Sequence, residues 1–154
     1  MKRILTCISI LMMMFVCSAA SAAEPVMVHD AWVRSAPPNA KALGAFMSIV
    51  NVTDKPVALI AASSRLFGKV ELHKSEMHGD MMKMVRQKRI VVPAGGSLTL
   101  KPGSYHVMLM KPKRVPEAGE LVDLKLRFDN GITLHVKALV RAAKGDGMMK
   151  GHQH

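Results

Sequence analysis

The stretch Glu71–Met110, ELHKSEMHGDMMKMVRQKRIVVPAGGSLTLKPGSYHVMLM, combines strand-like alternation with side chains that bind soft metals. Its last six residues, YHVMLM, alternate with the two-residue period of a β-strand, which places His106 and Met108 on the same face. The polar, glycine-containing segment KSEMHGD lies between His73 and Met84 and predicts a hairpin or longer turn that returns the chain beside itself. The stretch therefore predicts that these four side chains meet at one site.

The remaining sequence also consists of short strand-like runs separated by turn residues. The expected strands cover residues 26–33, 42–52, 57–62, 69–73, 82–92, 97–101, 105–110, 121–128 and 132–140. The segment Asp129-Asn130-Gly131 is typical of a hairpin, because Asn-Gly suits the positive φ angles of tight two-residue turns. Strands at this spacing with little helical periodicity predict an all-β sandwich or closed barrel, and they leave the strand order open.

The beginning of the chain resembles an export signal. Lys2 and Arg3 form a basic start, residues 4–16 form an apolar run, and residues 20–23 offer small-residue cleavage positions. The apolar run is shorter than the roughly 20 residues of a membrane-spanning helix, so we expect cleavage and no later membrane span, with an uncleaved anchor as the alternative. Cys17 lacks the preceding small residue of a lipid-attachment signal. The expected organisation is a signal peptide (1–23), one domain (24–142) and a flexible Met/His-rich tail (143–154).

The charge of the chain is strongly basic, with 22 Lys and Arg residues, 11 Asp and Glu residues and a formal net charge of +11. The basic residues are spread along the sequence, and Trp32 and Tyr105 are its only Trp and Tyr. Such a chain has no aromatic platform for stacking single-stranded bases. We therefore expect solubility and weak steering toward an acidic partner rather than nucleic-acid binding.

Both cysteines, Cys7 and Cys17, lie in the expected signal peptide. The mature domain would then have no thiol for a disulfide, a nucleophile or a thiolate metal site. Imidazole and thioether donors bind copper in an oxidising compartment without the risk of disulfide formation. Neutral thioether sulfur favours Cu(I) over Mg²⁺ and Ca²⁺, which prefer oxygen ligands. Structural zinc is usually held by Cys or His, so a site with two Met ligands does not suit zinc. Protons compete for imidazoles, so binding should weaken below about pH 6.5.

Single methionines and histidines in this sequence also have ordinary structural interpretations, such as packing in the core. Taken alone, Met84 or Met108 would be an ordinary core residue, so the metal interpretation depends on the four donors together. Met110 shares the strand face of His106 and Met108 and is interpreted as a packing residue. Four residues near the connection, Met77, His78, Met81 and Met82, are interpreted as loop and hairpin-packing residues, because their spacing specifies no closed geometry. A second, looser set of donors is the alternative.

The spacing of the four donors resembles the periplasmic copper chaperones of the PCuAC family, whose signature is His, ten residues, Met, twenty-one residues, His, one residue, Met. Here ten residues separate His73 from Met84, twenty-one separate Met84 from His106, and one separates His106 from Met108. The resemblance continues through DAWVR at 30–34, the strand ending at Asn51, PAGG at 93–96 and KPG at 101–103, and it covers nearly the whole expected mature chain. It departs at Ser104, where the family often has Gly, and at Lys111-Pro112, where Gly-Leu is usual.

This resemblance implies a single-domain, cupredoxin-like Greek-key β-sandwich or barrel. It implies a periplasmic, non-enzymatic chaperone that binds Cu(I) through His73, Met84, His106 and Met108. The implied acceptors are the CuA subunit of cytochrome c oxidase or a thiol-containing assembly protein. Some proteins of this family have Met/His-rich tails, for which binding of additional copper, including Cu(II), is expected. The corresponding candidates here are Met148, Met149, His152 and His154.

Three other functions remain as alternatives. Periplasmic copper buffering or tolerance would use the same site as delivery. An electron-transfer cupredoxin would need a Cys thiolate with two His ligands, which the expected mature chain lacks. An enzyme would need acid–base groups at one place, and nothing in the sequence gathers His29, Asp30 and His135.

Overall fold

The computed structural model describes residues 24–142, which form β-strands and no helix. The strands are β1 (Val26–Arg34), β2 (Ala42–Asn51), β3 (Val57–Ser63), β4 (Phe67–His78), β5 (Met81–Gln87), β6 (Ile90–Val92), β7 (Ser97–Leu100), β8 (Tyr105–Pro112), β9 (Leu121–Phe128) and β10 (Thr133–Arg141). The expected signal peptide (1–23) and tail (143–154) lie outside the described residues. None of the described elements is a helix long and apolar enough to cross a membrane.

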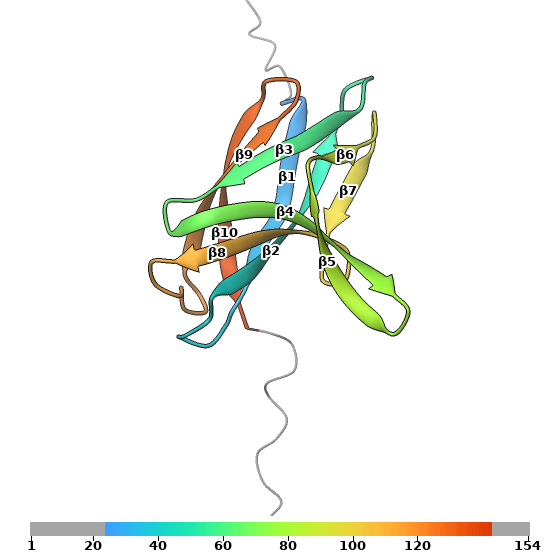
Figure 1. Ribbon diagram of the computed structural model, residues 1–154. Coiled ribbons are helices and arrows are strands. Elements are labelled where there is room, and N and C mark those ends of the chain that lie inside the picture. The colour runs from blue at the N-terminus through green and yellow to red at the C-terminus, as the bar shows by residue number, and fades with distance from the viewer. Residues whose placement is uncertain (1–23, 143–154) are drawn as a thin grey trace, which may run out of the picture.

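The strands form one mixed sheet in the order β5-β4-β8-β2-β1-β10-β9-β3-β6, and β7 pairs with β2 beside this path (Figure 1). The β1–β10 pair is parallel and the other pairs are antiparallel. The sheet does not close, but it folds back so that β3 contacts β4 and β6 contacts β7. The predicted all-β, cupredoxin-like single domain is thus confirmed, as an open sheet folded on itself rather than a closed barrel.

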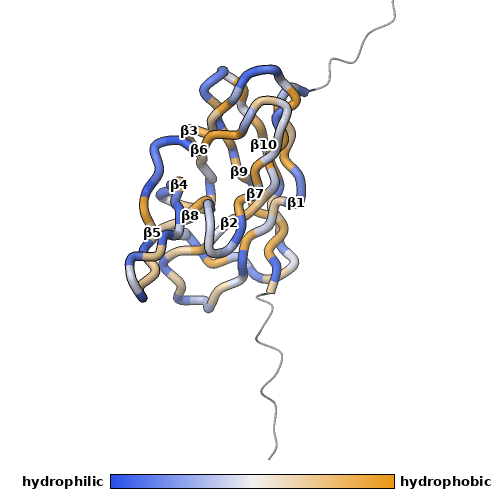
Figure 2. The backbone as a smooth tube through the Cα atoms, turned by 90° about the vertical axis from the view of Figure 1, so that its right-hand side faces the viewer, coloured by the Kyte–Doolittle hydropathy of each residue, from blue (hydrophilic) through white to orange (hydrophobic). Residues whose placement is uncertain are grey.

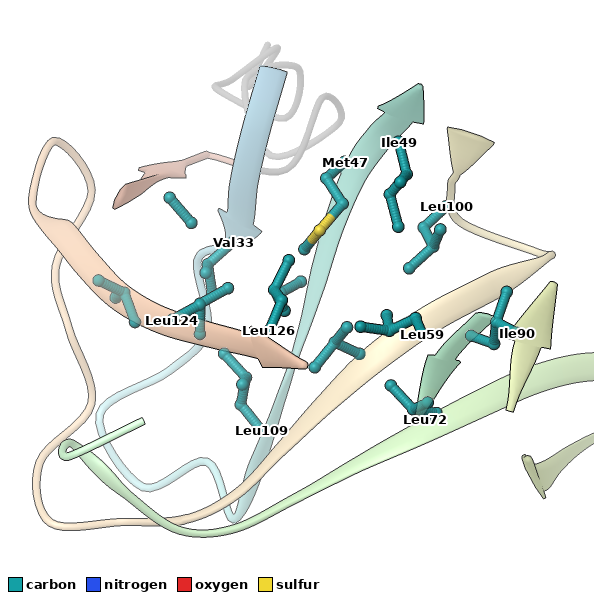
Figure 3. Close-up of a cluster of buried hydrophobic side chains, with 14 of the residues drawn as sticks. Val33, Met47, Ile49, Leu59, Leu72, Ile90, Leu100, Leu109, Leu124 and Leu126 are labelled. Atoms are coloured by element: carbon teal, nitrogen blue, oxygen red, sulfur yellow. The ribbon is translucent and has the colours of Figure 1, made fainter. Parts of the chain in front are cut away.

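The core lies between the folded halves of the sheet and consists of alternate strand residues (Figure 3). In β9 every second residue is buried, from Val122 to Phe128. Hydrophobic and hydrophilic residues alternate along the strands in the same way (Figure 2). Such alternation is expected because successive side chains of a strand point to opposite faces.

The part of the sheet that carries the candidate donors runs from β2 through β8 and β4 to β5. The first half of β2 pairs with β8, and β8 also pairs with β4. Leu72, Val107 and Leu109 of β4 and β8 are buried in the core. The residues that alternate with them, among them His73, His106 and Met108, therefore lie on the opposite face of these two strands.

One local prediction was wrong. Residues 82–92 were expected to form one strand, but β5 pairs with β4 whereas β6 pairs with β3. The chain changes partners at Lys88-Arg89, and burial changes with it, because β5 has no buried residue while Ile90 and Val92 are buried. The predicted hairpin between His73 and Met84 is confirmed, because β4 and β5 pair antiparallel. Its strands are longer than expected, since β4 continues to His78 and only Gly79-Asp80 form the turn.

The turn at residues 129–131 forms the predicted hairpin with a different geometry. The loop has three residues rather than two, 129–131, between the paired residues Phe128 and Ile132. The Phe128 N–H donates to the Ile132 carbonyl (2.9 Å), and the Gly131 N–H donates to the Phe128 carbonyl (3.2 Å). Only Gly131 has a positive φ (87°) in this turn. This is the pattern of a turn followed by a left-handed glycine, in which Asn130 keeps an ordinary backbone conformation.

Candidate metal site

Three adjacent strands bring the predicted donors to one face of the sheet. In the β4–β8 pair, His73 is opposite His106 and Glu71 is opposite Met108. In the β4–β5 pair, Met84 is opposite Ser75, which lies two residues after His73. Because cross-strand partners and residues two apart share a face, all four predicted donors lie on this face.

His73 is held by a carboxylate next to it on the same face. Its Nε2 lies 2.9 Å from a carboxylate oxygen of Glu71, whose side chain is only 9% exposed. The hydrogen bond from His73, followed by that from Lys69, lowers the pKa of Glu71 to about 2. An ionised carboxylate can only accept, so Nε2 carries the proton and Nδ1 keeps its lone pair. Nδ1 is buried and has no hydrogen-bond partner.

In His106 the two ring nitrogens have the opposite roles from those in His73. Its Nδ1 donates to the Ser104 carbonyl (3.1 Å), and that carbonyl also accepts from the Ser75 N–H (3.1 Å). Its Nε2 is buried without a partner, and the residue is only 3% exposed. The His106 and His73 ring centroids are 5.8 Å apart. Each histidine thus has one nitrogen fixed by the protein and one left available.

Buried ring nitrogens without partners are costly unless a ligand uses them. Metal–imidazole bonds are about 2 Å long, so a single ion fits between two rings at this separation. Hydrogen bonds from the second ring nitrogen to a carboxylate or carbonyl are the usual supports of metal-binding histidines. The chemistry of both rings therefore fits a metal ion that needs neutral imidazole.

A groove of about 340 Å³ opens beside these rings. Its wall includes three of the four predicted donors, His106, Met84 and Met108, and also Met82. Met84 is 55% exposed, whereas His106 is buried. His73 does not line the groove, but its ring lies next to that of His106, which does. The groove could hold a thiophilic ion between exposed thioether sulfur and buried imidazole nitrogen.

Several contributing residues were missed by the sequence analysis. Phe46 lies in the groove wall, with its ring centroid 4.6 Å from that of Trp32 and 6.3 Å from that of His106. Gly44 is opposite Met108, and a Cβ at this position would lie 2.9 Å from the Phe46 ring. A glycine inside a strand often marks such a close approach, and Glu71 is two residues from His73, so both had a sequence signal.

The two departures from the PCuAC pattern have distinct structural outcomes. Ser104 contributes its backbone carbonyl to His106, which any residue could supply. Lys111 adopts a positive φ of 53°, a conformation that costs a non-glycine residue about 1–2 kcal/mol. The last residues of β8 therefore adopt a backbone conformation that suits glycine, with lysine at this position.

Met110 and the tail residues were the other candidates considered. Met110 is opposite Ala42 and Lys69 on the same face, but it does not line the groove. The auxiliary candidates Met148, Met149, His152 and His154 lie outside the described residues. Among residues 24–142, no three His, Cys, Asp or Glu side chains form a metal-binding group.

The sequence is similar to a described family and to a curated relative. Residues 26–140 match the family described as putative lipoprotein LpqE-like. A putative lipoprotein of Leifsonia xyli subsp. xyli is 32% identical over 124 residues, which are 80% of this chain and 74% of that protein.

Solved structures are similar as well. The copper-bound PCuAC domain from PmoF2 is 24% identical, with a TM-score of 0.68 over 79% of this chain and 97% of that chain. The Cu(I) form of DR1885 from Deinococcus radiodurans is 36% identical, with a TM-score of 0.59 over 80% of this chain and 83% of that chain.

Proposed function

Because the chain belongs to the LpqE-like family of putative lipoproteins and has the fold of a PCuAC domain, we propose that it is an exported copper chaperone. It binds Cu(I) through His73, Met84, His106 and Met108 and passes the ion to an acceptor protein. The similarity to a Cu(I)-bound protein of 36% identity supports the choice of metal. The similarity to putative lipoproteins supports export, and we place the protein in the periplasm.

The observation that carries this proposal is the pair of buried ring nitrogens without partners, Nδ1 of His73 and Nε2 of His106. Each ring is oriented by a hydrogen bond at its other nitrogen, as is usual for histidines that bind a metal. The thioethers of Met84 and Met108 complete a neutral donor set that suits Cu(I). Because none of these donors is charged, bound copper keeps its single positive charge.

Copper transfer needs ligand exchange and no bond-making in a substrate. The exposed Met84 is the donor that an acceptor's ligand can replace first, while the buried histidines hold the ion. The acceptor that we propose is the CuA subunit of cytochrome c oxidase or a thiol-containing assembly protein. Buffering of periplasmic copper would use the same site, and only transfer to an acceptor distinguishes the two functions.

The test is anaerobic Cu(I) titration against a chromophoric chelator, with each of the four donors replaced in turn by Ala. Each replacement should weaken binding by more than the roughly 10–100-fold that loss of a supporting contact to a metal ligand costs. His135→Ala and Met110→Leu are matched controls, because His135 is exposed elsewhere and Met110 is on the same face outside the groove. Equal affinity in donor and control variants would refute the site.

Delivery is tested separately from binding. Cu(I)-loaded protein is mixed with an apo CuA domain, and the characteristic absorption of the assembled centre is followed after oxidation. Delivery predicts that the acceptor gains copper faster than it does from an equally strong chelator. If copper stays on this protein while the binding test succeeds, buffering is the function.

A further inference from the structure

The hairpin formed by β4 and β5 exposes an unusual number of methionines. Met77, Met81, Met82 and Met84 are 55–64% exposed. The hairpin projects from the body of the domain (Figure 1), and no residue of β5 is buried. These methionines therefore do not pack in the core. Methionine is also not among the residues that favour exposed strands, so neither packing nor strand formation accounts for them.

The strand register sorts the four methionines into two groups. Met77 is directly opposite Met82, and Met84 follows Met82 by two positions. These three share the face of His73, because Ser75 is opposite Met84 and lies between His73 and Met77 on that face. Met81 is opposite His78 and lies on the other face. We call Met77, Met82 and Met84 the methionine stripe.

We propose that Met77 and Met82 form a second Cu(I) site on the hairpin, through which copper enters and leaves the groove. Met84 completes this site when the groove is empty and binds the groove ion when the groove is filled. This inference rests on the proposed function, because Met84 belongs to both sets. It revises the interpretation of Met77 and Met82 as packing residues. The probe that defines the site is Cu(I), or Ag(I) as its redox-stable analogue.

The spacing of the stripe suits one soft ion. Cross-strand partners such as Met77 and Met82 have Cβ atoms about 4.5–5.5 Å apart. Residues two apart on a strand, such as Met82 and Met84, are about 6.5–7 Å apart. Methionine has three rotatable side-chain bonds and a polarizable sulfur, so three thioethers at these distances can converge on one ion.

The stripe is continuous with the imidazole site. Met82 and Met84 both line the groove that also contains His106 and Met108. Copper can therefore move by forming a bond to a stripe thioether before a bond to a histidine breaks, with no change of oxidation state. Because the hairpin site lacks imidazoles, it binds more weakly than the groove site, as a transfer position requires.

The experiment uses the full protein labelled with ¹³C at the methionine methyl groups and titrated with Ag(I) and anaerobic Cu(I). The first equivalent should shift the signals of Met84 and Met108. A further equivalent should shift Met77 and Met82, while Met81 stays unchanged as the matched control on the opposite face. The inference is overturned if Met77 and Met82 do not shift, or if Met81 shifts as much as they do.

A double variant tests the role in transfer. Met77→Leu with Met82→Leu keeps the apolar surface but removes two thioethers, so it should lose the second equivalent and slow transfer of copper to a chelator. In the single variant Met77→Leu, which changes no residue of the groove wall, the affinity of the first equivalent should stay within about twofold, as for a surface substitution. Met81→Leu should behave as the wild type. Unchanged stoichiometry and transfer rate in the double variant would assign the stripe to protein docking instead.

The outcomes separate this inference from the proposed function. If the first equivalent does not shift Met84 and Met108, the groove site itself fails. If it does, and only Met77 and Met82 remain unmoved, the chaperone proposal stands without the hairpin site.

Discussion

Glu71 is the residue that decides which nitrogen of His73 can bind a metal. Its carboxylate accepts a hydrogen bond from Nε2 and is also close to Lys69 (2.9 Å) and Arg86 (3.4 Å). These contacts keep its pKa near 2, so it remains a carboxylate throughout the range in which histidines titrate. Acidification should therefore weaken copper binding through the imidazoles and not through Glu71.

Glu71→Gln should weaken Cu(I) binding by about 10–100-fold without abolishing it. The amide removes the negative charge that fixes the tautomer, and its NH₂ group can compete for the same ring nitrogen. The measurement is the anaerobic chelator titration between about pH 5 and 7.5.

Glu76→Gln is the control for Glu71, because Glu76 also lies on β4 and pairs with Lys74 but is on the opposite face. It should bind Cu(I) as the wild type does. An affinity of Glu71→Gln equal to that of the control would show that the carboxylate does not support the metal-binding ring. Independence of Cu(I) affinity from pH in the wild type would contradict the assignment of two imidazoles.

For single residues, the sequence predicted which donors share a face of the sheet but not which contacts orient each side chain. The period of two in YHVMLM placed His106 and Met108 together, and the structure has them so. The available nitrogen of each ring depends on side-chain rotamers and on contacts with Glu71 and the Ser104 carbonyl. Spacing carries no information on these rotamers.

The β4–β5 hairpin is the element that positions Met84 and the methionine stripe. Its turn has glycine at the first central position with a φ of 61° and no other positive φ, which suits a type II′ turn. β5 and the part of β4 after Leu72 have no buried residue, so their order depends on this turn and on the pairing between the two strands. Such elements open locally without global unfolding.

Replacing the glycines of the two hairpin turns by Ala should separate these roles. Gly79→Ala should weaken Cu(I) binding and change the unfolding free energy by less than about 0.5 kcal/mol, because strain in an exposed hairpin is relieved by local opening. Gly131→Ala, at a φ of 87° between the core strands β9 and β10, should lower the unfolding free energy by about 1–2 kcal/mol. Its Cu(I) affinity should not change.

Urea unfolding and chelator titration of both variants check this prediction. Equal effects of the two substitutions on copper affinity would mean that the hairpin does not position a donor. Strand prediction itself was limited here by the same element, because residues 82–92 contain no Gly or Pro that would mark an end between β5 and β6. The change from exposed β5 to buried β6 follows from pairing with different strands, which local sequence does not encode.

At the scale of the whole molecule, the strand order makes a site out of distant segments. The order β5-β4-β8-β2 places β8 between β4 and β2, although some 25 residues separate the end of β4 from the start of β8. The strand pattern predicted an all-β domain, and the family resemblance supplied the cupredoxin-like fold. Strand order followed from neither periodicity nor turn residues, because it depends on which long-range pairings bury the core together.

Deletion of the tail tests whether residues outside the domain also bind copper. Met148, Met149, His152 and His154 form a soft donor set at the end of the chain, within a segment rich in Gly and Lys. Deleting residues 144–154 should lower the total copper bound, with Cu(II) affected as well as Cu(I), because imidazoles also bind Cu(II). The groove should keep its Cu(I) affinity, since its donors all lie within residues 73–108.

A variant of full length with the four tail donors changed to Ser separates donor loss from shortening, and atomic absorption with chelator titration measures both quantities. If stoichiometry is unaltered in both variants, the tail has no part in copper binding. If groove affinity also falls, the tail and the groove act on the same ion.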